Sequence, residues 1–257
     1  MTYFEGFIVP VPEANKAAYE KHATQFAPLV RNVGVARMVE SWDSDVPEGK
    51  VTDFRKAVDA KPDEKIVFSW FEYPNREARD AANEKFMSDP QMAEMGKDMP
   101  FDGKRMVMGG FDAIVEEGSG GGAYIDGFVV PVPEAKREAY RELASKMAKV
   151  FRENGASRVI EAFSDDVSHG KVTDFYRAVK GGRRRRRLLL HRMARQAGAR
   201  QCVGKDYGRR KPAAPGRHAV RRQAHVLGRL REDPRYRTEA SSADDGIRHR
   251  LNSSPIS

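Results

Sequence analysis

Three carboxylates stand inside segments whose β-branched and aromatic residues predict apolar strands. Glu5, Glu40 and Glu72 belong to YFEGFIVPV, VARMVESW and KIVFSWFEY, and a carboxylate in such a segment is rarely buried without a partner. The cations that could answer them are Arg37 and Arg105. Carboxylates and guanidinium groups gathered in a cavity can transfer protons or bind a charged ligand. The sequence therefore offers the three glutamates and Arg105 as candidate catalytic residues.

Two tryptophans, Trp42 and Trp70, lie in the same predicted strands and would form apolar walls of such a cavity. With Arg37 they are candidate ligand-binding residues. The alternative is that the charged strand residues form a salt-bridged sheet surface or a seam between two subunits. Because neighbouring side chains of a strand point to opposite faces, the spacing does not place all three glutamates on one face. Both interpretations stay open, and we favour the salt-bridged surface or seam over a cavity.

The loop DSDVPEGKVTDF carries a second candidate ligand site, because Lys50 and Asp53 could position an anionic ligand. Asp and Gly are also the residues that turns require, and Asp53 can cap a helix. We favour that structural role. The segment MPFDGKRM is similar, since Asp102 and Gly103 indicate a turn into the last strand.

His22 is the one histidine of residues 1–117, and an imidazole that titrates near neutrality could serve as a general base. It lies, however, on the apolar stripe of a predicted helix, and an internal repeat described below places Leu143 at the matching position. A group that is replaced by leucine within one chain is a poor candidate for an essential residue. We therefore expect a packed core histidine.

The sequence carries no motif that is typical of a metal or cofactor site. Its single Cys202 excludes a disulfide framework and a cysteine zinc cluster, and no phosphate-binding loop, dinucleotide fingerprint, HExxH or nucleophile elbow occurs. No apolar run approaches the roughly 18 residues of a membrane span, and the first residues do not resemble a signal peptide. We expect no metal, no cofactor, no membrane contact and a cytoplasmic location.

The elements that must position these residues follow a βαββαβ order, which is the ferredoxin-like split unit. Periodicity predicts strands over residues 3–11, 35–42, 65–73 and 105–115, with helices after Glu13 and over 75–89. The two helices would cover one face of the sheet. The other face carries aromatic side chains and needs a partner.

An internal repeat with an offset of 121 residues extends this domain. YFEGFIVPVPEA at Tyr3 returns as YIDGFVVPVPEA at Tyr124, and GKVTDFRKAV returns as GKVTDFYRAV. The sequence thus predicts a complete domain over residues 1–117, a Gly/Ser linker over 118–123 and the first half of a second copy over 124–180.

The repeat stops at an arginine run, and residues 181–257 hold 21 Lys and Arg against 6 Asp and Glu. Read one nucleotide out of frame, the codons allowed for 191–195 permit IEWPD, which matches FEYPN at Phe71. Those for 218–225 permit MPFDGKRM, as at Met99. We infer a frameshift, and we expect a disordered basic tail that binds nucleic acid only non-specifically. The second copy would then lack its third and fourth strands, which leaves exposed sheet edges.

The segments GFVVPVP, GKVTDF and MPFDGKRM resemble the bacterial YbaA-like proteins, a family of unknown function placed with the dimeric α+β barrels. The resemblance implies a ferredoxin-like fold and pairing with itself, as a homodimer or as an intrachain pseudo-dimer. It implies no activity and no catalytic residues. We expect a protein that binds a small molecule or a partner; a cofactor-independent enzyme using the strand carboxylates, nucleic-acid association through the tail and a purely structural dimer module are the alternatives.

Overall fold

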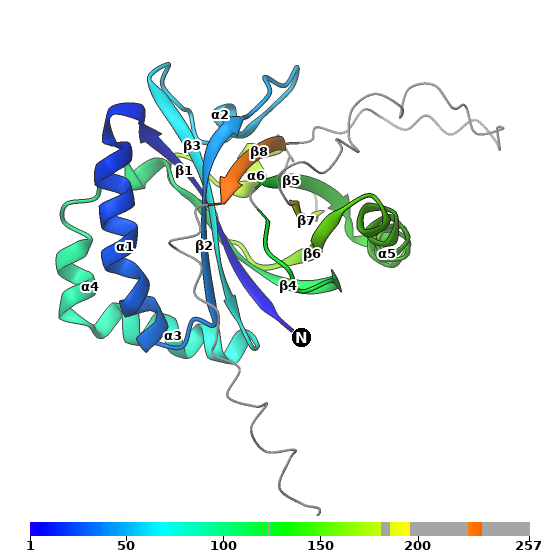
Figure 1. Ribbon diagram of the computed structural model, residues 1–257, viewed down its shortest axis with the longest axis horizontal. Helices are drawn as coiled ribbons and strands as arrows, with labels where there is room; N and C mark the ends of the chain where they lie inside the picture. The colour runs from blue at the N-terminus through cyan, green and yellow to red at the C-terminus, as the bar shows by residue number, and fades with distance from the viewer. Residues whose placement is uncertain (123, 181–185, 196–225, 233–257) are drawn as a thin grey trace, which may run out of the picture.

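The computed structural model describes residues 1–122, 124–180, 186–195 and 226–232, and its strands close into one barrel (Figure 1). The barrel order is β1-β3-β2-β8-β5-β7-β6-β4. The first repeat contributes one half of the barrel as β4-β1-β3-β2, and the second contributes the other half as β8-β5-β7-β6. This is the predicted α+β barrel, made here by two copies within one chain.

The first repeat follows the predicted βαββαβ order. Its strands are β1 (Tyr3–Pro12), β2 (Arg37–Asp45), β3 (Glu64–Tyr73) and β4 (Val107–Glu117). Its helices are α1 (Lys16–Asn32), α2 (Phe54–Ala57), α3 (Arg76–Ser88) and α4 (Pro90–Met95), with short 3-10 turns η1 (Glu13–Asn15) and η2 (Gly103–Arg105). The boundaries agree with the sequence pattern to within a few residues, except that the short helices α2 and α4 were not predicted.

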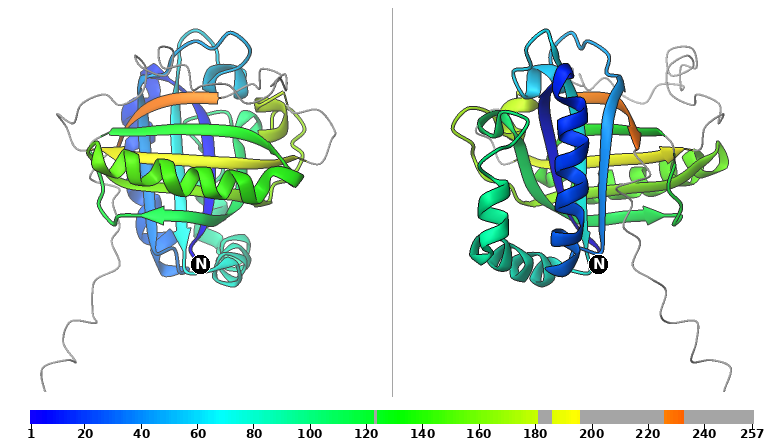
Figure 2. Two further views of the ribbon diagram at one scale, coloured as in Figure 1. Left: turned by 90° about the vertical axis from the view of Figure 1, so that its right-hand side faces the viewer. Right: turned by 60° about the vertical axis from the view of Figure 1, so that its left-hand side comes forward.

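Local sequence sets the ends of α3 and α4. Asn75 caps α3, because its side chain accepts a hydrogen bond of 2.8 Å from the Ala78 amide. Pro90 cannot continue that helix but suits the first turn of a new one. Asp89 caps this second helix through the Gln91 amide, at 2.8 Å. The chain therefore turns from α3 into α4, which lies beside α1 (Figures 1 and 2).

The second repeat copies the first as far as its second strand. It contains β5 (Tyr124–Pro133), η3 (Glu134–Lys136), α5 (Arg137–Glu153), β6 (Ala156–Asp166) and α6 (Phe175–Ala178), followed by β7 (Arg186–Arg195) and β8 (Val226–Glu232). Helix α5 covers the outer face of the second half-barrel (Figure 2). The two halves join where β4 pairs with β6 and β2 pairs with β8.

The expectation that residues 181–257 are disordered is wrong for two segments. Strand β7 pairs with β5 and β6, and β8 pairs with β5 and β2, so the edges expected to be exposed are covered. Tyr124 pairs with Arg195 as Tyr3 pairs with Tyr73. The physical reason is that a strand edge offers only backbone groups, which an extended segment of any sequence can meet. The arginines 183–185 and the other residues of the expected tail lie outside the described ranges.

The sheet of the first repeat has an apolar core on each of its two faces. The barrel interior is filled by side chains of both repeats, among them Phe54, Phe68, Trp70, Phe111 and Phe175. The outer core of the first repeat lies between the sheet and its helices and contains the residues Tyr3, Val9, Tyr19, Val30 and Met38. No helix within the described ranges has both the length and the apolar character that crossing a bilayer requires.

Candidate functional site

The three strand glutamates do not share one site. Paired residues of an antiparallel sheet point to the same face, and Glu72 pairs with Arg37 in a row that faces the barrel interior. Glu40 pairs with Ser69, which in turn pairs with Phe7, in a row that faces the helices. Glu5 also faces the helices, but it stands in the next row and lies against α3.

Glu72 forms a buried ion cluster inside the barrel. Arg158 of the second repeat donates to its two carboxylate oxygens at 2.9 and 3.0 Å. Arg37 lies at 3.6 Å, and the Trp70 indole donates at 3.0 Å. Arg158 also binds Glu116 of β4. These contacts place Glu72, Arg37 and Trp70 in a connection between the repeats, as the seam interpretation proposed.

Glu5 belongs to a second connection between the repeats. The Tyr73 hydroxyl donates to it at 3.3 Å, and Arg79 of α3 lies 3.8 Å away. Arg79 also donates to Asp166 of β6 at 2.7 Å and to the Tyr3 hydroxyl at 3.0 Å. Burial raises the pKa of Glu5, and the nearby Arg79 charge opposes that shift.

Arg105 does not answer any of the three strand glutamates. Its guanidinium holds Glu64 with two hydrogen bonds of 2.7 and 2.6 Å, and it also donates to Asp102 and to the Asp59 carbonyl. This bidentate pair connects the turn before β4 to the start of β3. With so many donors engaged, Arg105 serves the fold rather than a ligand.

Asp53 is a helix cap that also holds the loop before it. Its carboxylate accepts from the amides of Lys56 at 2.8 Å and Gly49 at 3.0 Å, and the Lys56 ammonium lies at 3.0 Å. A side chain at Gly49 would meet the Thr52 carbonyl at 2.0 Å, so this turn requires glycine. Lys50 is exposed. The favoured structural interpretation of the loop agrees with these contacts.

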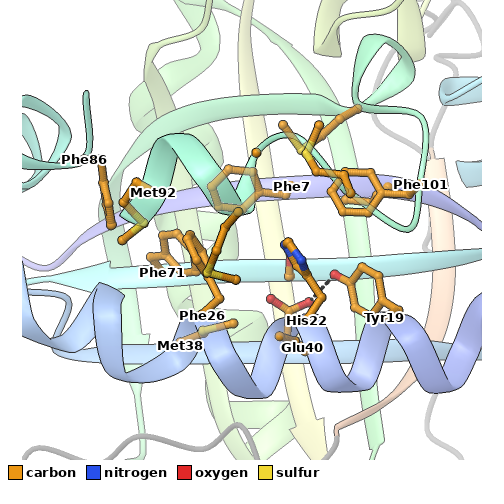
Figure 3. A pocket seen from close by; sticks show the side chains of 17 residues that line it. Phe7, Tyr19, His22, Phe26, Met38, Glu40, Phe71, Phe86, Met92 and Phe101 are labelled. Carbon is orange, nitrogen blue, oxygen red and sulfur yellow. Dashed lines mark hydrogen bonds between the residues drawn. The ribbon is translucent and has the colours of Figure 1, made fainter. Parts of the chain in front are cut away.

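A cavity of about 290 Å³ lies between the sheet and the helices of the first repeat (Figure 3). We call it the α1–α4 cavity. It is lined by the aromatic rings Phe7, Tyr19, His22, Phe26, Phe71, Phe86 and Phe101, the methionines Met38, Met92, Met95, Met99 and Met106, and the smaller or polar residues Val9, Ala23, Glu40, Ser69 and Gly96. It is thus an apolar cavity with one carboxyl group.

Regular elements hold the floor and one wall of this cavity. Strands β1, β3 and β2 supply the floor, since Phe7, Ser69 and Glu40 stand side by side in one row. Tyr19 and His22 come from α1, where residues three apart share a face. The opposite wall comes from α3, α4 and the following loop. Met99 in that loop is 40% exposed, so the cavity reaches the surface on this side.

Glu40 is the buried carboxyl group of the cavity. The Tyr19 hydroxyl donates to its Oε2 at 2.7 Å, and the Ser69 hydroxyl also bonds to the carboxyl group. Burial raises the pKa of Glu40 to about 7, and these two hydrogen bonds oppose the shift. Near neutral pH the carboxyl therefore exists in both protonation states, which is the property of a group that exchanges protons or meets a charge.

His22 lines the cavity instead of lying in a packed core. Its ring stacks on Phe26 with 6.3 Å between centroids and meets Phe101 edge-on at 6.4 Å. Partial burial lowers its pKa, which favours the neutral imidazole at neutral pH. Trp42 lies outside the lining. Its ring centroid is 6.2 Å from that of Tyr19, and the Lys16 ammonium lies over its ring, 5.3 Å from the centroid.

The second repeat keeps part of this arrangement. The Tyr140 hydroxyl donates to Glu161 at 3.4 Å, as Tyr19 does to Glu40, and Arg137 lies 5.4 Å from the Phe163 ring, as Lys16 lies over Trp42. Leu143, at the position of His22, is 55% exposed. A tyrosine–glutamate pair under the first helix is thus a feature of both copies.

Sequence reasoning selected Glu40 and missed its surroundings. The signal for Tyr19 was present, because a tyrosine recurs at the same place in both repeats. The methionines of α4 gave no signal, since that helix was not expected. Within the described part of the chain, no group of three or more His, Cys, Asp or Glu side chains is placed to hold a metal ion.

Comparison with known sequences identifies the family. The family described as "Protein of unknown function (DUF1428)" matches residues 2–103 and 123–184, which together exceed half of the chain. The uncharacterized protein YbaA of Escherichia coli K12 is 58% identical over 117 residues, covering 46% of this chain and 100% of YbaA. The protein of the same name in Shigella flexneri matches equally.

Comparison with solved structures identifies the fold. An anthrone oxidase-like protein superposes with a TM-score of 0.52 at 6% identity, covering 90% of this chain and 91% of that one. A crystal structure described as a putative monooxygenase from Fusobacterium nucleatum gives a TM-score of 0.48 at 10% identity, with 76% of each chain covered. At these identities the likeness is one of fold.

Proposed function

We propose that this chain, which belongs to the DUF1428 family of unknown function, binds a small and largely apolar molecule in the α1–α4 cavity. The observation that carries the proposal is an apolar cavity with one buried carboxyl group on its floor. Small-molecule sites are typically concave, mostly apolar and equipped with a few polar groups that orient the ligand. Glu40, Tyr19 and Ser69 are such groups.

The size and the composition of the cavity support a ligand rather than an empty packing defect. Its volume of about 290 Å³ lies near the lower end of the range of ligand sites, roughly 300–1,000 Å³. Five of its lining residues are methionines, whose flexible thioethers adapt to ligands of different shapes. Three of them, Met92, Met95 and Met99, belong to the wall formed by α4 and the following loop.

Cofactor-independent proton transfer is the second candidate function. It is favoured by the hydrogen-bonded Tyr19–Glu40 pair, because a buried carboxyl with a pKa of about 7 can act as a general acid or base at neutral pH. Fold likeness to an anthrone oxidase-like protein adds no argument of its own, since one fold serves many functions. Binding must therefore be established first.

The test is ligand binding before and after the cavity is filled. The fluorescent probe N-phenyl-1-naphthylamine should bind the full chain with increased emission. Ala23→Leu, a buried position in the lining, should abolish that binding while the far-ultraviolet circular dichroism stays unchanged. Ala17→Leu, on the exposed side of the same helix, is the matched control and should bind normally. Equal binding by both variants would place the probe elsewhere and contradict the proposal.

A further inference from the structure

The lining of the α1–α4 cavity carries a carboxyl group and no permanently positive side chain among its described residues. Its ionisable lining groups are Tyr19, His22 and Glu40, and the described residues that line it include no lysine or arginine. On α1, the Lys16 ammonium lies over the ring of Trp42, which is outside the lining. From the floor, β3 contributes the neutral Ser69 and β1 the neutral Phe7, and α4 contributes methionines. Glu40 is therefore the charge-bearing group that a ligand would meet.

Within the described part of the chain, the ionised form of Glu40 receives hydrogen bonds from Tyr19 and Ser69, and no cation is among the groups that shift its pKa. Tyr19 and Ser69 donate to the carboxyl, yet burial outweighs them. A buried carboxylate becomes favourable when an opposite charge lies within about 4–6 Å. A cationic ligand would supply that charge, whereas an anionic ligand would place two like charges in an apolar site.

The aromatic rings of the lining form a surface that also suits a cation. The ring centroids of Phe7 and Phe71 are 5.0 Å apart, and those of Phe26 and Phe71 are 6.1 Å apart. The ring centroids of Phe101 and Tyr19 are 5.8 Å apart. Aromatic faces attract ammonium groups, and cages of such rings recognise quaternary ammonium ligands. The same face of the sheet already uses this interaction in the Lys16–Trp42 contact, and in Arg137–Phe163 of the second repeat.

From this arrangement we propose that the ligand of the α1–α4 cavity is an organic cation, with its ammonium group against Glu40 and its apolar body among the aromatic and methionine side chains. The inference rests on the proposed function and adds the chemical class of the ligand. His22 does not oppose it at neutral pH, because burial disfavours the protonated imidazole.

Proton linkage makes this proposal measurable. A cation prefers the ionised Glu40, so its affinity rises with pH until the carboxyl is fully ionised. With a pKa of about 7 in the free protein, the association constant should increase about 30-fold between pH 5.5 and pH 8. A neutral ligand of the same shape gains nothing from ionisation, and its affinity should not rise.

The experiment compares benzyltrimethylammonium with its neutral carbon isostere, neopentylbenzene, by titration of the full chain at both pH values. The permanent charge of the cation ensures that pH acts on the protein alone. At pH 8 the cation should bind at least 10-fold more tightly than the isostere. Glu40→Gln should remove both this preference and the pH dependence, so that the two compounds bind alike at both pH values. His22→Leu, which installs the residue of the second repeat, should keep the pH dependence.

The outcomes separate this inference from the proposed function. If both compounds bind equally, or phenylacetate binds better than the cation, the inference fails while the cavity remains a binding site. If Glu40→Gln keeps the full preference for the cation, Glu40 is not its partner and the inference fails again. If none of the three compounds binds and Ala23→Leu changes nothing for N-phenyl-1-naphthylamine, the proposed function itself is contradicted.

Discussion

Arg158 of the second repeat donates two hydrogen bonds, of 2.9 and 3.0 Å, to the two carboxylate oxygens of Glu72 in the first repeat. Both side chains are at least nine-tenths buried, and they lie in the interior of a barrel that neither repeat closes alone. An ion pair at this place connects the two halves, and it explains why a carboxylate stands in the apolar strand β3.

Loss of this pair should destabilise the chain strongly. Arg158→Ala removes the cation that makes two hydrogen bonds to the buried Glu72 and leaves Arg37 at 3.6 Å. Removal of one partner of a buried pair costs about 3–5 kcal/mol. Urea unfolding should show this loss in the free energy of unfolding. Arg141→Ala, which breaks the exposed Arg141–Glu138 pair on α5, is the control and should cost less than about 1 kcal/mol. Equal effects of the two variants would contradict the role of the cluster.

The Asp53 loop should respond as a structural element and not as an anion site. Asp53→Ala removes a helix cap that accepts two backbone amides, which should cost about 1–2 kcal/mol in the free energy of unfolding. Lys50→Ala alters an exposed side chain and should stay within about 0.5 kcal/mol. Thermal unfolding with and without phosphate checks both variants. A stabilisation by phosphate that Lys50→Ala abolishes would restore the anion-site interpretation.

Glu40 and Glu72 show how much of the site could be predicted from the sequence. Both were selected because a carboxylate in an apolar strand needs a reason, and strand boundaries within a few residues followed from periodicity. Their separation onto opposite faces needed the pairing register, which places Glu40 beside Ser69 and Glu72 beside Arg37. The cavity needed α4 as well, and a six-residue helix with two methionines and no buried residue leaves little periodic signal.

Strands β7 and β8 show a different limit. Their sequence does not match the first repeat, and a scrambled pattern of apolar residues argued against structure. Backbone pairing does not depend on that pattern, and the register of β5 with β7 repeats that of β1 with β3. An edge that needs a partner can thus select a segment by its position in the chain.

Glu40 should make the protein less stable as pH rises. Its pKa is about 7 in the folded chain against an ordinary value of 4.5, so the folded state binds more protons between these values and the free energy of unfolding falls with increasing pH. The total effect is up to about 3 kcal/mol. Glu40→Gln, which still accepts from Tyr19, should therefore unfold at higher urea than the unmodified chain at pH 8 but not at pH 4.

The control for this measurement is Glu84→Gln, an exposed carboxylate on α3. It should leave the difference between pH 4 and pH 8 unchanged, because its side chain is exposed to water in the folded chain. Glu5 also has a raised pKa, so the Glu40→Gln chain should keep part of the slope. An unchanged slope in Glu40→Gln would show that its carboxyl is not held protonated.

The first repeat alone should form a homodimer. Residues 1–117 contain one complete half-barrel, but without the second repeat β4 loses β6 and β2 loses β8. Two unpaired edges and an aromatic inner face are then exposed, and a second copy can cover all three by pairing its β4 with β2 and its β2 with β4. The 117-residue match to YbaA covers that whole protein, so one repeat is a complete chain there. Light scattering of the fragment should give twice the monomer mass, with one cooperative thermal transition.

Arg37→Ala distinguishes this dimer from incidental association. Arg37 and Arg158 occupy equivalent positions of the repeat, so in the dimer the Arg37 of each copy must take the place of Arg158 on the other copy's Glu72. In the full chain Arg37 is only the more distant partner, at 3.6 Å, and Arg158 remains. The substitution should therefore weaken dimerisation of the fragment by at least 10-fold but lower the melting temperature of the full chain only slightly. A folded monomeric fragment, or a dimer indifferent to Arg37→Ala, would show that the barrel interior is not the surface on which two repeats meet.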